Sequence, residues 1–346
     1  MYYVAVSLRW LKDNLFSNAV NTLTTLSLTA FLLWSLPPLI DWMIINASFV
    51  GSSNNDCNNE GACWVFIREF FPRLMFGSYP ESERWRIYST GIIAILFIFT
   101  ARQYHRTAFS VILFGLFSII AVTLLYGGFL GLSRVDTHQW GGLFLTIVIA
   151  TVGIVGAFPL GILLALGRQS HLPVIRAFCH VFIELWRGVP LITVLFMASV
   201  MLPLFLPDNI DINKLLRALL CIMLFASAYL AEVIRGGLQS LPSGQQEAAS
   251  ALGLTYWQQM RYIILPQALQ RVIPGIVNTF IGLFKDTTLV LIIGLFDFLG
   301  IVQSAATNPE WLGRANEGYA FAALIFWIFC FSMSRYSLHL ERKQDQ

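Results

Sequence analysis

Residues 141–167 read GGLFLTIVIATVGIVGAFPLGILLALG, a run without any Asp, Glu, Lys or Arg. A helix of about 20 apolar residues is long enough to cross the hydrocarbon core of a bilayer. Because that core offers no water to bond an exposed backbone, a helix that satisfies its own hydrogen bonds is stable there. The stretch therefore predicts a transmembrane helix.

Similar apolar stretches recur along the chain and predict about eight spans. The second and the last are at the short limit for a spanning helix. The expected spans are Asn14–Ile40, Ile87–Ala101, Thr107–Leu132, Gly141–Gly167, Val189–Leu206, Leu215–Ile234, Val272–Phe296 and Tyr319–Met333. The expected fold class is therefore all-α, a polytopic bundle of transmembrane helices.

The composition agrees with a membrane protein and disfavours two other classes. Of the 346 residues, 57% are hydrophobic and 12% are charged, whereas a soluble domain has about 25% charged residues. The net charge is only +3 and the basic residues are scattered. A protein that binds nucleic acid would be expected to gather them on one face, so we expect no nucleic-acid partner.

The charges of the loops predict how the chain is oriented. With the N-terminus in the cytoplasm, the inner side holds Lys12, Arg102, Arg168, Arg235 and Arg261, and the outer side holds Asp208, Asp211, Glu310 and Glu317. Basic residues favour the cytoplasmic side of short loops. We therefore expect both termini in the cytoplasm and the long polar loop of residues 46–86 outside.

Two of the five cysteines bracket part of that outer loop, Cys57-Asn-Asn-Glu-Gly-Ala-Cys63. An oxidising compartment would allow a disulfide between them, and the sequence leaves open whether they are paired or free. The cysteines and the five histidines have no spacing typical of a zinc site, so we expect no metal.

The segment between the sixth and seventh expected spans is too long to be a plain connection, which usually has about 2–8 residues. Ser243-Gly-Gln-Gln246 and Thr255-Tyr-Trp-Gln258 each match a capping box, at which a helix begins. Gly253 lies between them and suits the left-handed end of a helix. The segment therefore predicts two short helices hinged at Gly253, the second ending before Pro266.

The side chains of these two helices predict contact surfaces. The first helix has a face of little bulk, suited to close approach by another protein, formed by Ala248, Ala249 and Ala251. The second has a packing stripe at i, i+4 and i+7, formed by Tyr256, Met260 and Ile263. We expect the loop to bind a partner, and an amphipathic hairpin without a partner is the alternative.

Glu247-Ala-Ala249, Gly253 and Ile263-Ile-Leu-Pro266 together resemble the EAA motif of ABC importer permeases. In that family the motif forms a coupling helix that docks into a separate cytoplasmic ATPase. The resemblance implies that the residues coupling this chain to an ATPase dimer are Glu247, Ala248, Ala249, Gly253, Ile263, Leu265 and Pro266.

More of the chain is similar to one branch of that family, the permeases of polar amino acid importers. The matching stretches are Gly141–Thr146, Leu164–Arg168, Glu184–Leu191, Pro242–Gln245 and Lys285–Leu289. The helices before them resemble those of general L-amino-acid importers, which work as heterodimers of two related permeases. The resemblance implies a type I permease core at residues 141–340, with the coupling loop at about 240–268. Accessory helices would occupy residues 1–140.

The resemblance also implies the function. It describes a permease subunit that moves polar or general L-amino acids across the bacterial inner membrane, fed by a periplasmic binding protein. The chain has no Gly-x-x-x-x-Gly-Lys-Ser/Thr loop for phosphates, so we expect no enzyme activity and no cofactor on it, with ATP and Mg²⁺ on the partner ATPase. An ion-gradient-driven secondary transporter is the alternative, and it would predict inverted repeats.

Four charged residues in or near the expected spans are further candidates for a functional role. Lys285 and Asp286 interrupt the seventh span, where charges usually face a cavity or another helix. Adjacent helical residues point about 100° apart, so we expect the two to face different ways. A translocation path and an ion pair with another span or a second permease are both open. Glu184 and Arg187, at i and i+3, are expected to neutralise each other, with a gating or interface role as the alternative.

Overall fold

The computed structural model describes residues 10–58, 60–103, 107–129, 131–205, 207 and 212–342. Asp208 and Asp211, which the charge pattern places outside, are not among them. The longer helices are α2 (Ala19–Ile40), α4 (Trp85–Gln103), α5 (Thr107–Tyr126), α6 (Gly142–Arg168), α10 (Lys214–Gln239), α14 (Ile273–Asp286) and α16 (Ala315–Arg342). The shorter ones are α3 (Trp64–Phe76), α7 (Pro173–Gly188), α8 (Leu191–Phe196), α9 (Leu202–Phe205), α11 (Ser243–Ala251), α12 (Tyr256–Gln259), α13 (Leu265–Arg271) and α15 (Phe298–Ala306).

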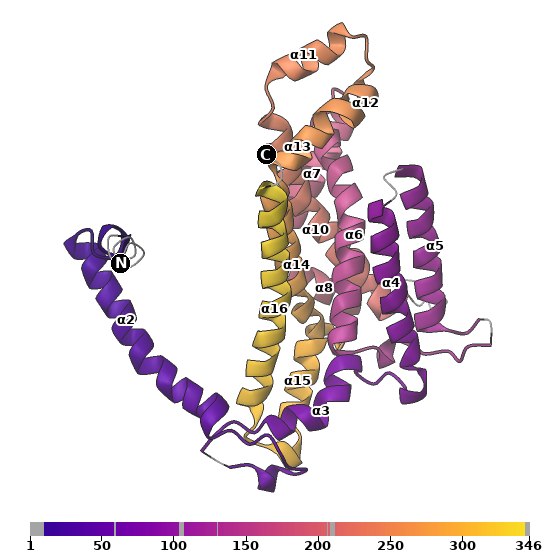
Figure 1. Ribbon diagram of the computed structural model, residues 1–346. Coiled ribbons are helices and arrows are strands. Elements are labelled where there is room, and N and C mark those ends of the chain that lie inside the picture. Colours follow the sequence, from indigo (N-terminus) through magenta and orange to yellow (C-terminus); the bar gives the residue numbers. More distant parts are fainter. Residues whose placement is uncertain are drawn as a thin grey trace. The chain divides into compact units, whose positions relative to one another are not determined.

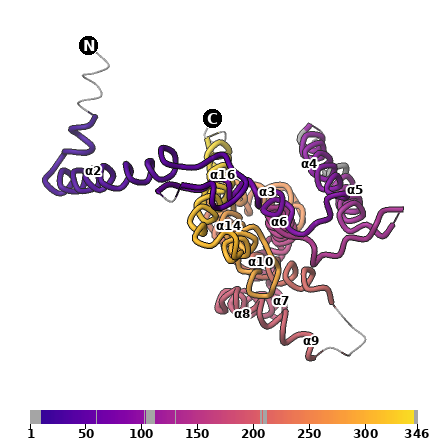
Figure 2. The backbone as a smooth tube through the Cα atoms, turned by 90° about the horizontal axis from the view of Figure 1, so that it is seen from below, coloured from indigo at the N-terminus to yellow at the C-terminus, as the bar shows by residue number. Residues whose placement is uncertain are grey.

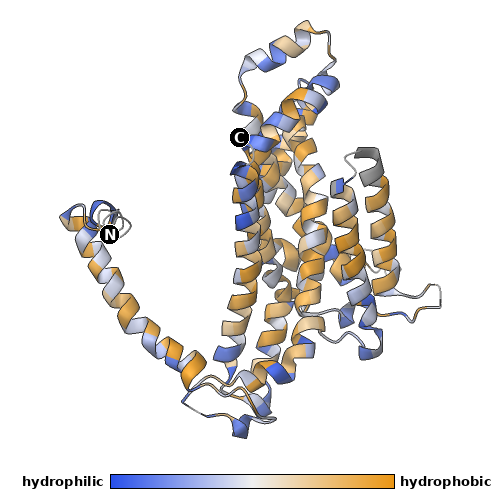
Figure 3. Ribbon diagram, in the orientation of Figure 1, coloured by the Kyte–Doolittle hydropathy of each residue, from blue (hydrophilic) through white to orange (hydrophobic). Residues whose placement is uncertain are grey.

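The all-α bundle expected from the sequence is confirmed, and about eight spans agree with it. Within the described residues, six helices are long and apolar enough to cross a membrane: α2, α4, α6, α10, α14 with its 3₁₀ extension to Ile293, and α16. The bent pair formed by α7 and α8–α9 would be a seventh span, and α5 is a shorter apolar helix. Figure 3 shows the apolar residues along these helices and the polar ones gathered near their ends.

The fifth expected span differs from the prediction in where its helix begins. Residues 191–205 are helical as expected, through α8, a π-helical turn and α9. They are preceded by α7, which bends from them by 99°. Val189 and Pro190 at the bend are extended, because proline lacks the N–H that a helix needs and disfavours the helical conformation of the residue before it.

The described residues form two compact units. The first contains the residues up to Phe70 together with 306–318, and the second contains residues 71–305 and those from Tyr319 onward. This division follows packing and is not the expected division at residue 140 into accessory helices and core. That functional boundary stays a prediction.

A disulfide and a ring cluster hold the first unit together. Cys57 and Cys63 are joined by a disulfide, with their Cα atoms 5.5 Å apart. Trp311 packs against Phe66 and Phe70, with ring centroids 5.7 and 6.3 Å apart. These contacts attach the polar loop to the segment that precedes most of α16.

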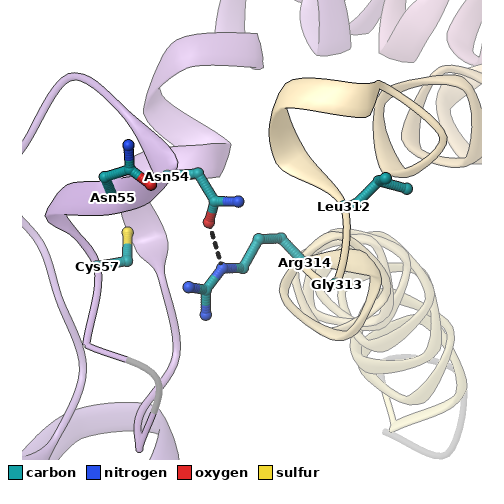
Figure 4. A pocket seen from close by; sticks show the side chains of 6 residues that line it. All are labelled: Asn54, Asn55, Cys57, Leu312, Gly313 and Arg314. Carbon is teal, nitrogen blue, oxygen red and sulfur yellow. Dashed lines mark hydrogen bonds between the residues drawn. The ribbon is translucent and has the colours of Figure 1, made fainter.

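Polar contacts of the same unit surround a cavity of about 420 Å³. The Nε atom of Arg314 donates to Oδ1 of Asn54 over 2.8 Å, as Figure 4 shows. Glu317 is buried, and its Oε1 accepts from the backbone N–H of Cys63 over 3.0 Å. The cavity is therefore polar and is built from two segments far apart in the sequence.

In the second unit, α10 is the central helix. It contacts α6, α7, α8, α13 and α14, and Figure 2 shows it between α14, α6 and α7. Gly161 allows α6 to approach it closely, because a Cβ atom there would lie 2.8 Å from Cβ of Leu230. By contrast, α4 and α5 pack mainly against each other (Figure 2).

The start of α15 is tied to the start of α6. The backbone N–H of Phe298 donates to Oγ1 of Thr146 over 3.0 Å, and that of Gly142 donates to the carbonyl of Phe296 over 3.0 Å. Asp297 lies between them, is fully buried and accepts at Oδ1 from the N–H of Gly300 over 2.9 Å. Burial raises the pKa of Asp297 from 3.8 to about 6, although the hydrogen bonds at the helix start lower it.

The raised pKa of Asp297 predicts a pH-dependent stability. Between pH 3.8 and about 6 the folded chain binds more protons at this site than the unfolded chain, so stability falls as the pH rises. The full cost above that window is about 3 kcal/mol. Asp297→Asn keeps a capping side chain without the titration. Relative to wild type, its melting temperature in detergent should therefore rise from pH 4.5 to pH 7.5. An unchanged difference between the two proteins across that range would contradict the assignment.

Candidate functional site

The segment expected to bind a partner forms a separate helical loop at one end of the second unit. It consists of α11, then α12, a π-helical turn over Met260–Ile264, and α13. Figure 1 shows α11 and α12 beyond the ends of α6 and α10, on the same side as the C-terminal end of α16. The loop enters directly from α10 and leaves directly into α14.

Gly253 is the hinge of this loop, as predicted. Its φ is +73°, the left-handed conformation that glycine adopts without the steric cost of a Cβ atom. The N–H of Leu254 donates to the carbonyl of Ala249 over 3.3 Å, and that of Gly253 to the carbonyl of Ser250 over 2.9 Å. This is the Schellman arrangement, which ends α11 and turns the chain towards α12.

The two expected capping boxes have different outcomes. At the second, Oε1 of Gln258 accepts from the N–H of Thr255 over 2.9 Å, and α12 begins there as predicted. The first is wrong. Ser243 is already the first residue of α11, and the cap is Pro242, whose backbone is extended. With Pro242 as the cap, the third helical residue is Gln245, and proline has no N–H for its side chain to accept, so a reciprocal box cannot form.

The prediction that the second helix ends before Pro266 is also wrong. The chain stays helical from Tyr256 to Arg271, and Pro266 lies in the first turn of α13. The π-helical turn immediately before it changes the hydrogen-bond register from i−4 to i−5. A helix can thus pass a residue that lacks a donor.

The exposed face of the loop differs in part from the expected one. Ala249 is 1% exposed, so it packs inside the loop and cannot belong to a contact surface. Glu247, Ala248, Ala251 and Gly253 are exposed. Leu252 and Trp257, which the sequence did not single out, are 77% and 67% exposed. A leucine and a large aromatic side chain are therefore exposed on the loop in addition to the small residues.

The other motif residues lie in the second half of the loop. Ile263 and Leu265 are half-buried, and Pro266 is exposed. Of the expected packing stripe of Tyr256, Met260 and Ile263, only Met260 is buried. The buried positions recur instead at Met260, Ile264 and Ala268.

Gln259 holds the two halves of the loop together. Its side chain is buried, and Nε2 donates to the carbonyl of Leu254 over 2.7 Å and to Oγ of Ser250 over 3.2 Å. At the base of the loop, Arg271 donates to the carbonyl of Ser240, and Nε2 of Gln267 donates to Oε1 of Gln245 over 3.2 Å. These bonds make the loop one body attached to α10 and α14.

A cavity of about 320 Å³ lies between the same two helices and α8. Most of its wall is apolar, and its polar residues are Tyr229 on α10 and Asn278, Thr279 and Asp286 on α14. Oγ1 of Thr279 donates to the carbonyl of Gly275. The side chains of Asn278 and Asp286 carry no hydrogen bond to another described residue. They are available to a polar ligand.

Lys285 and Asp286 point in different directions, as expected. Asp286 lines the cavity and is half-buried, whereas Lys285 is exposed. Across the described part of the chain, neither forms a salt bridge with another span. The ion pair with another span is therefore not formed among the described residues, and the translocation path and the pair with a second permease stay predictions.

Comparisons with known proteins identify the family of the chain. The family model described as binding-protein-dependent transport system inner membrane component matches residues 157–346. The chain belongs to this family.

Relatives with established names make the assignment more specific. This permease is 55% identical over 338 residues to the inner membrane amino-acid ABC transporter permease protein YhdY of Escherichia coli (strain K12), with 96% of this chain and 92% of the relative covered. It is 39% identical over 406 residues to the glutamate/glutamine/aspartate/asparagine transport system permease protein BztC of Rhodobacter capsulatus, with 97% and 93% covered.

A solved structure matches as well. It is titled as an amino acid ABC transporter with histidines, is 28% identical, and covers 58% of this chain and 92% of its own, with a TM-score of 0.52. The permease is therefore a subunit of a polar amino acid ABC transporter and a multi-pass protein of the inner membrane.

Glu184 and Arg187 were expected to pair with each other, and the structure shows instead that both belong to a cluster of charges on α6, α7 and α10. Glu184 lies 3.2 Å from Arg168, and Arg187 lies 3.9 Å from Glu232, so they pair with other helices and not with each other. Glu232 also pairs with Arg168 and, over 2.9 Å, with Arg235. One carboxylate on α10 thus joins α6, α7 and α10.

Sequence reasoning missed Glu232 and Gln259. Both lie within runs that already had an interpretation, one as a span and the other as a capped helix. Glu232 could have been noticed, because a carboxylate inside an apolar span usually has a partner. Gln259 had no such signal, since its partner is a backbone carbonyl exposed only by the fold at Gly253.

Replacing Gln259 should loosen the loop. Gln259→Ala leaves the carbonyl of Leu254 without its donor, and an unsatisfied buried group costs about 1–3 kcal/mol. We expect faster hydrogen–deuterium exchange in peptides covering α11 and α12. Gln270→Ala is the matched control, because Gln270 is exposed and forms no hydrogen bond with another described side chain. Equal exchange in the two variants would show that Gln259 does not hold the loop.

Proposed function

We propose that this permease uses the α11–α13 loop to receive a separate cytoplasmic ATPase, and that the loop transmits ATPase closure to the cavity between α10 and α14. One observation carries the proposal. The loop is continuous with the two helices that supply most of the cavity wall. A displacement of the loop moves both walls, whereas a loop joined to other helices would leave the cavity unchanged.

The surface of the loop suits a protein partner. Leu252 and Trp257 are large apolar side chains that remain mostly exposed, and such residues can supply much of the binding energy in interfaces. The exposed small residues Ala248 and Ala251 of α11 permit close approach. Glu247, one turn into α11, adds a charge at the rim, where charged groups are usually found.

The cavity suits an amino acid as substrate. The carboxylate of Asp286 can bind a substrate ammonium group, and the amide of Asn278 and the hydroxyl of Tyr229 can bind its carboxylate. The volume of about 320 Å³ is at the lower end of the range for small-molecule sites. We propose that polar or general L-amino acids pass here, and that the side chain is selected mainly by a periplasmic binding protein.

The remaining partners follow from an importer of this kind. ATP and Mg²⁺ would bind to the ATPase dimer, and a second, related permease would pair with this chain. Both termini and the α11–α13 loop would lie in the cytoplasm, and the disulfide-bonded loop of residues 46–86 would face the periplasm. A disulfide is favoured in that oxidising compartment, which supports this orientation.

Gly253→Val tests the loop. A β-branched residue in the left-handed conformation costs about 1–2 kcal/mol, which corresponds to a factor of about 5–30 in an equilibrium. In the assembled transporter we expect ATPase stimulation and amino acid uptake to fall by that factor while the permease stays in the membrane.

Gly244→Ala is the control for that variant. Gly244 lies in the same helix, and a Cβ atom there would meet nothing within 4 Å. Normal uptake by Gly253→Val would contradict the docking role of the loop. Active transport by the purified permease without an ATPase would favour the ion-gradient alternative.

Asp286→Asn tests the cavity. The substitution keeps the shape but removes the charge, and a hydrogen bond to a charged group is worth about 1.5–3 kcal/mol. We expect uptake across a panel of labelled amino acids to show a KM raised by roughly tenfold or more. Lys285→Gln, at the exposed neighbouring position, should leave KM nearly unchanged. A larger effect at Lys285 than at Asp286 would place the path on the other face of α14.

A further inference from the structure

Helix α7 has an apolar face that the bundle does not cover. Cys179 and Ile183 are buried against the bundle. On another face, side chains at i, i+4, i+7 and i+11 are 61–79% exposed, namely Val174, Phe178, Val181 and Leu185. That spacing places them in a single stripe along the helix.

The same helix carries unpaired basic side chains beside a cavity. Arg176 and His180 lie one turn apart and are exposed, and neither side chain forms a hydrogen bond or ion pair with another described residue. With Arg168, Pro173 and Ala177 they line a cavity of about 340 Å³. Arg168 already pairs with Glu184 and Glu232, so Arg176 and His180 are the free donors.

The position of α7 explains what could occupy this cavity. Glu184 contacts Arg168 at the last residue of α6, and Arg187 contacts Glu232 near the end of α10. The helix therefore crosses the ends of two spans, and it bends by 99° from α8–α9. An apolar stripe and a basic face at the end of a membrane span are typical of a helix in the bilayer interface.

We propose that the cavity between α6 and α7 binds the phosphate of an anionic phospholipid, while the apolar stripe, on the opposite face of α7, lies against the acyl chains of the bilayer. Arg176 and His180 supply hydrogen-bond donors for the phosphate oxygens, which guanidinium groups bind well. The site lies on the cytoplasmic side in the proposed orientation, and basic pockets between spans on that side bind anionic headgroups.

Binding of the lipid would also affect the transport cavity through α7. The guanidinium of Arg187 on α7 lies 5.5 Å from the ring centroid of Tyr229, and Tyr229 lines the cavity beside α14. A lipid that fixes α7 therefore fixes one wall of the cavity. Transport should then depend on anionic lipid, which goes beyond the proposed role of the loop.

Thermal unfolding of the assembled transporter in detergent tests the site directly. We expect dioleoylphosphatidylglycerol to raise the melting temperature of the wild type by at least about 2 °C, and dioleoylphosphatidylcholine to have less effect. Arg176→Gln with His180→Gln should raise the half-saturating concentration of phosphatidylglycerol by about fivefold or more. Arg176→Gln alone, at an exposed position, serves as a second variant.

Arg335→Gln is the matched control, because Arg335 is exposed near the C-terminal end of α16. It removes the same charge and should keep the wild-type response. Three results would overturn the proposal. The first is an unchanged response of the double variant to phosphatidylglycerol. The second is an equal rise in melting temperature with sn-glycerol 3-phosphate. The third is that Phe178→Ser releases a second permease from the complex while the response to lipid stays unchanged. The second would identify a soluble phosphate site, and the third a protein interface. Since the assay needs no transport, it can fail independently of the proposed function.

Discussion

The close packing of α10 against α6 is the contact on which the rest of the second unit depends. At Gly161 the two helices are so near that a single added Cβ atom would lie 2.8 Å from the neighbouring helix. With α6 fixed in this way, α10 also contacts α7, α8 and α14, and its end leads into the α11–α13 loop. Glu232 reinforces the same arrangement electrostatically, because it draws arginines from α6 and α7 onto α10.

This arrangement explains why a loop outside the bundle could govern a cavity within it. The loop is closed on itself by Gln259 and at its base by Arg271. It therefore has little freedom to move apart from α10 and α14. In the proposed function, α6 is the fixed support, and the space between α10, α14 and α8 is the part that would change. The polar side chains Asn278 and Asp286 face that space, so the change would occur around the substrate.

The sequence predicted what depends on local composition and missed what depends on distant partners. The apolar run at 141–167 became α6, shifted by one residue, because a spanning length of apolar side chains has few alternatives in a bilayer. Gly253 was also predictable, since a left-handed helix end favours glycine. Ala249 was misjudged because its burial depends on how the loop folds over it. Glu184 pairs across helices, and no spacing along one helix could have indicated Arg168. The prediction for Pro266 was that proline ends the helix before it, but the π-helical turn before Pro266 allows the helix to continue.

The central claim is that movement of the loop reaches the cavity, and cysteine labelling measures this most directly. Asn278→Cys can be introduced in the assembled transporter with the free cysteines Cys179, Cys221 and Cys330 replaced by serine and the Cys57–Cys63 disulfide retained. The labelling rate with a small maleimide is then compared with and without ATP. The account predicts that ATP changes this rate severalfold, because Asn278 lies on a wall that moves. An identical rate in both states, while the transporter hydrolyses ATP, would contradict it.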